Sequence, residues 1–142
     1  MEKYLKITFD KAIEAKNENE VPVGCVIVKE DKILSFGKNE QHTSGIITKH
    51  AEINAINDCC RKNGRYDLSG STIYVTLEPC LMCFGAILEA RIERIVYMID
   101  SPKYGFKNHL NEKDYSDKIK IEKTGDKYDY SKIIKNFFLS KR

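Results

Sequence analysis

Two short segments of this 142-residue chain bring together residue types that bind metals and transfer protons. They are His-Ala-Glu at 50–52 and Pro-Cys-Leu-Met-Cys at 79–83. On a helix, Cys80 and Cys83 would lie about 60° apart around the axis, so their thiolates can grip one tetrahedral ion. A position in the first helical turn also favours the thiolate, because the positive end of the helix dipole stabilises it.

Two cysteines leave a tetrahedral zinc ion short of ligands, and the sequence has no second Cys-x-x-Cys. His50 is the best third ligand, because His42 and His109 lie in polar stretches without a motif around them. Three protein ligands leave a fourth position for water, the pattern of a catalytic zinc site. Glu52 can take a proton from that water if His50 lies at the helix entrance, with Thr48 as the N-cap. Within a regular helix the two side chains would point about 200° apart.

The hydrophobic pattern predicts the elements that must position these segments. Helices are expected at 3–16, 48–61, 79–90 and 130–139, and strands at 21–29, 32–37, 71–77, 92–99 and 118–123. This order predicts an α/β fold with residues 1–142 as a single domain, a three-layer α/β/α sandwich with a mixed five-stranded sheet. Both segments would then lie at helix starts near the carboxyl ends of strands, where ligands bind in such folds.

Composition limits the class of protein. Hydrophobic residues make up 42% and charged residues 32% of the chain, which argues against a disordered, collagen-like or coiled-coil protein. The longest apolar runs, 23–28 and 95–99, are too short to span a membrane, and the first residues have no secretory signal. A cytoplasmic location is therefore expected. Five cysteines, an odd number, argue against a disulfide framework.

Charge is divided unevenly along the chain. The net charge of +3 combines −2 over residues 1–102 with +5 over residues 103–142, where eleven lysines and arginines face six aspartates and glutamates. A basic last quarter is typical of a protein with a polyanionic partner. A solvated lysine-rich tail explains the same numbers equally well.

Together the two segments match the H-x-E…P-C-x-x-C signature of zinc-dependent nucleobase deaminases. The chain resembles the cytidine-deaminase-like zinc superfamily, and within it most resembles the bacterial tRNA-specific adenosine deaminases. The most specific string is TLEPCLMC at 76–83. The resembling stretches are VPVGCVIV at 21–28, GKNE at 37–40, KHAEINAI at 49–56, the segment 71–97 and NFF at 136–138.

The resemblance implies a role for each matching residue. Proton transfer falls to Glu52. Asn39 matches an asparagine that contacts the target nucleoside, and the backbone at Ala51 would lie beside the target base. The implied zinc ligands, for one ion per chain, are His50, Cys80 and Cys83.

The implied reaction is hydrolytic deamination of adenosine to inosine at the wobble position 34 of a tRNA anticodon. Zinc activates the attacking water, Glu52 delivers the proton to the ring nitrogen, and ammonia leaves. An adenine in an anticodon loop is already unpaired, so moving it into a pocket costs little. The resemblance also implies a homodimer in which each anticodon loop contacts both subunits.

The match is weaker after the fourth predicted strand. There the family often has aspartate, any residue and lysine, and the aspartate contacts RNA. Lys103 matches the lysine, but Ser101 occupies the aspartate position. Asp100 comes one residue early and could replace the aspartate only if the loop shifts. We expect RNA contacts at Ser101 and Lys103. Phe137 and Phe138 are expected to pack against the sheet, or one of them to reach the substrate loop.

Two other functions stay open at this point. The chain can be a deaminase of a free base or nucleoside, such as guanine or cytosine, because related enzymes share the two motifs. From a different class, it can be a non-enzymatic zinc or dithiol module, which would not need Glu52.

Overall fold

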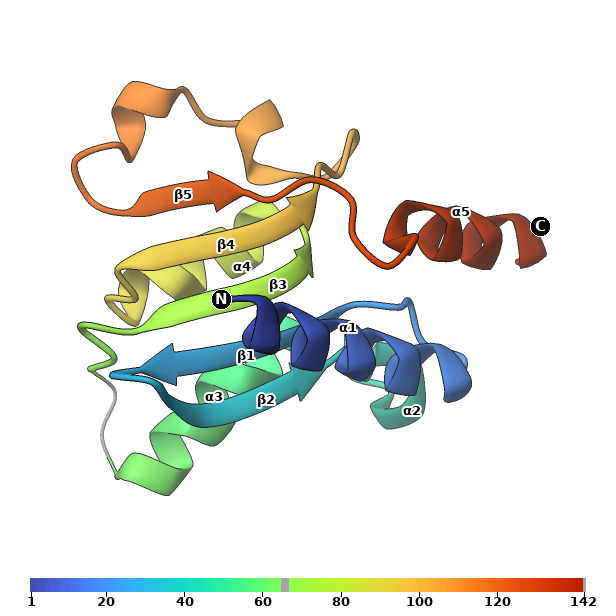
Figure 1. Ribbon diagram of the computed structural model, residues 1–142, viewed down its shortest axis with the longest axis horizontal. Helices are drawn as coiled ribbons and strands as arrows, with labels where there is room; N and C mark the ends of the chain where they lie inside the picture. The colour runs from blue at the N-terminus through green and yellow to red at the C-terminus, as the bar shows by residue number, and fades with distance from the viewer. Residues whose placement is uncertain (65–66, 142) are drawn as a thin grey trace.

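The computed structural model describes residues 1–64 and 67–141, which form a set of helices and strands (Figure 1). The helices are α1 (Glu2–Asn17), α2 (Gln41–Ser44), α3 (Ala51–Asn63), α4 (Leu81–Glu89) and α5 (Tyr130–Ser140). The strands are β1 (Gly24–Lys29), β2 (Lys32–Lys38), β3 (Thr72–Leu77), β4 (Arg94–Ile99) and β5 (Lys120–Lys123). Two short 3₁₀ helices, η1 (Phe106–Asn108) and η2 (Glu112–Asp114), interrupt the connection from β4 to β5.

The five strands form one mixed sheet in the order β2-β1-β3-β4-β5. β1 runs antiparallel to both of its neighbours, β2 and β3, whereas β3, β4 and β5 are parallel to one another. β2 to β5 therefore all point the same way, and their arrows in Figure 1 end on one side of the sheet. We call this side the carboxyl edge.

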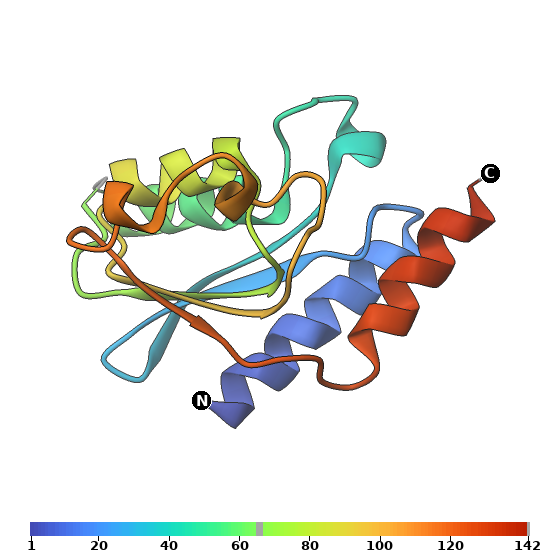
Figure 2. The ribbon, with the colours of Figure 1, turned by 90° about the horizontal axis from the view of Figure 1, so that it is seen from above.

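Helices cover both faces of the sheet (Figure 2). α3 and α4 lie on one face and α1 lies on the other, while α5 lies on the α1 side and extends beyond the carboxyl edge. Side chains such as Ile27, Val75 and Val96 fill the core between these layers and have no exposed surface. The predicted three-layer α/β/α sandwich with a mixed five-stranded sheet is confirmed. Within the described ranges, no helix is both long and apolar enough to cross a membrane.

The two helices that carry the motif segments begin later than the sequence predicts. His50, not Thr48, is the N-cap of α3, because the His50 N–H donates to the Thr48 carbonyl in a tight turn (2.8 Å) that precedes the helix. α4 starts after its N-cap Cys80 and not at Pro79. The Pro79 carbonyl accepts a hydrogen bond from the Phe106 N–H (2.9 Å), which holds this backbone outside the helix.

α5 is attached to the rest of the chain at its first residue. The buried Tyr130 donates a hydrogen bond from its hydroxyl to the Pro22 carbonyl, just before β1 (2.5 Å). Phe137 and Phe138 pack edge to face on each other with ring centroids 5.5 Å apart, and Phe138 is 53% exposed. The expectation that Phe138 packs against the sheet is wrong, because α5 extends past the sheet and not over its face.

Glu20 connects the chain before β1 to the loop after β2. This residue is only 2% exposed, and its carboxylate accepts hydrogen bonds from the His42 N–H (2.9 Å) and from the N–H and hydroxyl of Thr43. Burial alone would raise the pKa of Glu20, but these hydrogen bonds outweigh it and hold the pKa below its ordinary value of 4.5. The carboxylate thereby fixes the loop between Asn39 and His50.

β2 and α3 are in close contact at Gly37. A Cβ atom at this position would lie 2.0 Å from the Ala51 carbonyl oxygen and 2.9 Å from the Ala55 Cβ. Only the absence of a side chain lets β2 support the first turn of α3, the turn that contains Glu52.

Gly37→Ala should destabilise the protein by about 1–3 kcal/mol, the usual cost of overpacking a tight site. Urea unfolding of the zinc-loaded protein measures this change. Gly85→Ala in α4 is the matched control, because nothing lies within 4 Å of the Cβ it would add. If the two variants were equally stable, the close contact at Gly37 would not limit the fold.

Acid should weaken the attachment made by Glu20. Its folded-state pKa lies below that of the unfolded chain, so its contribution to stability is complete above about pH 5 and is lost as the pH falls through the folded pKa. Glu20→Gln should lower the free energy of unfolding at neutral pH by about 1–3 kcal/mol and flatten its decline in acid. Urea unfolding at a series of pH values checks both effects, with the exposed Glu89→Gln as control. Parallel pH profiles for wild type and Glu20→Gln would contradict this role.

Candidate zinc site

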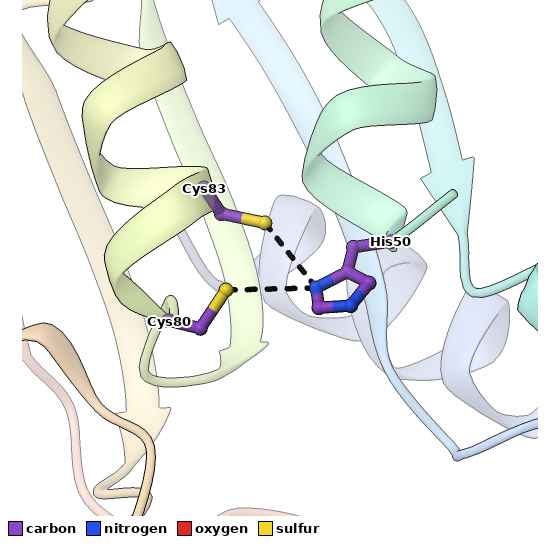
Figure 3. A group of neighbouring side chains, drawn as sticks. All are labelled: His50, Cys80 and Cys83. Carbon is purple, nitrogen blue, oxygen red and sulfur yellow. Dashed lines mark hydrogen bonds between the residues drawn. The ribbon is translucent and has the colours of Figure 1, made fainter. Parts of the chain in front are cut away.

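Three candidate ligands meet between the starts of α3 and α4 (Figure 3). His50 is the N-cap of α3, Cys80 is the N-cap of α4, and Cys83 lies in the first turn of α4. The strands that precede these helices, β2 and β3, end at the carboxyl edge on either side of β1. The two helix starts therefore lie side by side, and the three side chains point toward one another.

The spacing of the three donor atoms fits a tetrahedral zinc ion. The Nδ1 atom of His50 lies 3.6 Å from the Sγ of Cys80 and 3.5 Å from the Sγ of Cys83, and all three atoms lie within 4.8 Å of one another. Zinc–sulfur bonds of about 2.3 Å and zinc–nitrogen bonds of about 2.0 Å, at tetrahedral angles, separate nitrogen and sulfur by about 3.5 Å. These residues can therefore hold zinc and leave its fourth position open.

Without a metal, the same three side chains share protons. A hydrogen bond from the Cys83 thiol, assisted by His50, lowers the pKa of Cys80 to about 4. Donating that bond raises the pKa of Cys83, and the hydrogen bond with Cys80 raises the pKa of His50. Thiolates and neutral imidazole are the forms that coordinate a metal, so zinc would displace these protons.

Glu52 lies in the first turn of α3 and is only 4% exposed. Burial raises the pKa of its carboxyl group to about 7, and the carboxyl also interacts with Cys80, His50 and Cys83. His50 precedes the helix, as the sequence argument required, so it and Glu52 can serve one site. A carboxyl group with a pKa near neutrality can both take up and return a proton.

Asn39 directly follows β2, and Ala51 is the first residue of α3. Asn39 is buried, its side-chain amide donates to Gln41 Oε1 (3.3 Å), and its N–H donates to the Val23 carbonyl (3.1 Å). Ala51 is fully buried, and its carbonyl accepts a hydrogen bond from the Cys25 thiol (3.1 Å). Their expected contacts with a nucleoside stay predictions.

Asp100, the residue before Ser101, is bound by side chains of the protein itself. Its carboxylate accepts hydrogen bonds from Lys107 Nζ (2.8 Å), Lys123 Nζ (2.9 Å) and the Tyr97 hydroxyl (2.9 Å). The hydrogen bonds from the ammonium groups of Lys107 and Lys123 are the main cause that holds the pKa of Asp100 well below its usual range. Asp100 therefore forms ion pairs with Lys107 of η1 and Lys123 of β5.

The loop after β4 is held by a buried glutamate that the sequence argument does not identify. Glu78 accepts hydrogen bonds from the N–H groups of Ser101 (3.0 Å) and Lys107 (2.9 Å), while Lys103 between them is exposed. The sequence position of Glu78 does indicate such a role. Glu78 stands between an apolar strand and Pro79, and a carboxylate buried there needs hydrogen-bond donors. Glu20 was likewise missed, and it holds the loop after β2 in the same way.

Comparison with known proteins identifies the family. Residues 1–99 match the family model for the cytidine and deoxycytidylate deaminase zinc-binding region. A tRNA-specific adenosine deaminase of Buchnera aphidicola subsp. Schizaphis graminum is 37% identical over 98% of this chain and 94% of that protein. The tRNA-specific adenosine deaminase of Aquifex aeolicus is 40% identical over 73% of this chain and 69% of its own length.

Solved structures agree with this assignment. One, from a study of A-to-I editing by tRNA:A34 deaminases at the wobble position of transfer RNA, has a TM-score of 0.77 and 31% identity, covering 84% of this chain and 95% of that chain. A guanine deaminase from Bacillus subtilis has a TM-score of 0.66 and 39% identity, covering 70% of this chain and 64% of that chain. This chain therefore belongs to the zinc-dependent cytidine and deoxycytidylate deaminase family, a family of hydrolytic enzymes, and within it to the tRNA-specific adenosine deaminases.

Proposed function

We propose that this protein converts adenosine to inosine at the wobble position 34 of a tRNA anticodon by hydrolytic deamination. The observation that carries the proposal is the cluster of His50, Cys80 and Cys83 beside the buried Glu52. It occurs in a chain that matches a tRNA-specific adenosine deaminase over nearly its whole length. Three metal donors and one buried carboxyl group are the parts that hydrolytic removal of an amino group needs.

Each residue of the cluster has a defined task in this reaction. When bound by His50, Cys80 and Cys83, zinc supplies a water molecule of lowered pKa as the nucleophile. Glu52 would take one proton from this water and deliver it to the ring nitrogen next to the reacting carbon. The second proton of the water would pass to the amino group, which leaves as ammonia when its bond to the carbon breaks. The carboxyl group of Glu52 is buried and interacts with Cys80, His50 and Cys83, so it lies where it can pass the first proton on.

The substrate would approach from the carboxyl edge. Asn39 and the Ala51 backbone are the proposed nucleoside contacts, and Ser101 and Lys103 are the proposed RNA contacts. The loops that hold these residues leave β2 and β4 on the same side of the sheet as the cluster. An anticodon adenine is unpaired, so that placing it there requires little base-pair opening.

We infer that the enzyme acts in the cytoplasm as a homodimer. Leu81 and Met82 expose apolar side chains in the first turn of α4, next to Cys80. A second subunit that covers them would stand beside the substrate entrance. Light scattering coupled to size-exclusion chromatography measures the mass, and a monomer that is fully active on tRNA would contradict the dimer.

The direct test incubates the zinc-loaded protein with total bacterial tRNA and determines inosine at position 34. Free guanine, cytosine and cytidine are assayed in parallel for ammonia release, because a guanine deaminase is 39% identical over 70% of this chain. Inosine at the wobble position supports the proposal. Ammonia from a free base alone would replace it with the free-base reaction.

Glu52→Gln should bind zinc and fold but lose turnover by about 100-fold or more, because it removes the proton carrier. Single-turnover deamination of tRNA measures the rate, and metal analysis confirms the zinc content. Glu89→Gln, an exposed glutamate on α4, is the matched control. Turnover near the wild-type rate in Glu52→Gln would show that another group carries the proton.

Cys83→Ala should reduce bound zinc from one ion per chain to nearly none, since two remaining donors cannot complete the site. Elemental analysis after dialysis against a weak chelator measures the loss. Cys60→Ala is the control, because Cys60 is a half-buried thiol outside the cluster. Full zinc occupancy in Cys83→Ala would exclude this cysteine as a ligand.

A further inference from the structure

The carboxylate of Glu78 joins the candidate zinc site to the loop after β4. Glu78 is 3% exposed and stands two positions before Cys80. Its Oε1 accepts the N–H of Ser101 (3.0 Å), and its Oε2 accepts the N–H of Lys107 (2.9 Å). Among the described residues no lysine, arginine or histidine forms an ion pair with it, and both of its side-chain hydrogen bonds go to the two ends of this loop.

Two further contacts fasten the same loop, residues 101–107, to the start of α4. Cys80 pairs with Gly105 as an antiparallel bridge, which includes the hydrogen bond from the Phe106 N–H to the Pro79 carbonyl (2.9 Å). The Phe106 ring stacks on Phe84 of α4 with centroids 4.0 Å apart. The loop is therefore attached to the turn that carries the candidate ligands and not to the body of the sheet alone.

Gly105 lies so close to the carboxylate of Glu78 that no side chain fits at position 105. A Cβ at position 105 would lie 2.2 Å from both the carboxyl carbon and Oε1 of Glu78. The backbone at Gly105 has φ −62° and ψ 145°, values that any residue adopts. Glycine is therefore required here by the carboxylate and not by the backbone conformation.

The side chains at the middle of the loop are left free for a partner. Tyr104 is 68% exposed and Lys103 is exposed, and they stand between the two N–H groups that Glu78 holds. An aromatic ring beside an ammonium group can stack on an unpaired base while neutralising a phosphate. The loop thus presents RNA-binding chemistry at a fixed distance from Cys80.

We propose that Glu78 is a positioning residue for tRNA: it holds residues 101–107 against the zinc-bearing turn so that RNA contacts at Lys103 and Tyr104 place the target adenosine. This proposal rests on the proposed function. Both carboxylate oxygens are needed, because each accepts one N–H. A glutamine would offer one acceptor and turn an N–H₂ group toward the other N–H.

The test compares Glu78→Gln and Gly105→Ala with the control Glu89→Gln in the full-length, zinc-loaded protein. Hydrogen exchange of a peptide covering residues 100–108 reports the loop, metal analysis reports the site, and steady-state kinetics use an anticodon stem-loop RNA. Both variants should exchange faster in this peptide, retain zinc and raise KM about tenfold with a much smaller change in kcat. Glu89→Gln should match wild type in all three measurements.

The double variant Glu78→Gln with Gly105→Ala separates this arrangement from two independent defects. If both changes break one contact, the KM of the double variant should equal that of the worse single variant and not the product of the two effects. Lys103→Ala should raise KM without changing hydrogen exchange, because it removes an RNA contact and leaves the loop attached.

Three results would overturn the proposal. One is faster exchange in residues 100–108 with unchanged KM for RNA, and another is loss of zinc in both variants, which would make Glu78 a support of the metal site alone. The third is a kcat loss with unchanged KM. Failure of the proposed function is distinguishable, since wild type itself would then form no inosine in any RNA.

Discussion

The candidate site depends on the shared direction of β2 and β3, which end at the same edge of the sheet with β1 between them. This topology places the starts of α3 and α4 side by side, with His50 and Cys80 as their N-caps. An N-cap has extended backbone, so that its side chain can turn away from its own helix. The positive ends of both helix dipoles also converge there, which favours thiolates over thiols.

Two buried carboxylates extend this arrangement outward. Glu20 holds the loop after β2 through backbone N–H groups, and Glu78 does the same for the loop after β4. Each replaces hydration of its charge by hydrogen bonds from peptide groups, which satisfies a buried anion without a counterion. The two carboxylates therefore hold the loops on both sides of the cluster in place.

The sequence predicts those elements and ligands whose formation depends on residues close together in the chain. Apolar runs and, at 118–123, alternating apolar residues predict all five strands, and the spacing of Cys80 and Cys83 indicates a shared ion. The start of α4 differs from the prediction because a distant contact decides it: the Pro79 carbonyl accepts a hydrogen bond from Phe106, which no short-range pattern reveals. The start of α3 differs because a tight turn from Thr48 to His50 precedes the helix. The fate of Asp100 was equally hidden, since its partners Lys107 and Lys123 come from other elements.

The ion pairs of Asp100 reduce the attraction of the basic last quarter of the chain, residues 103–142, for a polyanion. Lys107 and Lys123 already share the charge of Asp100, and Lys127 lies near Glu2. Lysines that are paired within the protein release few counterions when a phosphate approaches, so the count of +5 overstates the attraction. Under the proposed function, recognition of RNA at this surface would therefore depend more on the shape and placement of the loop after β4 than on bulk charge.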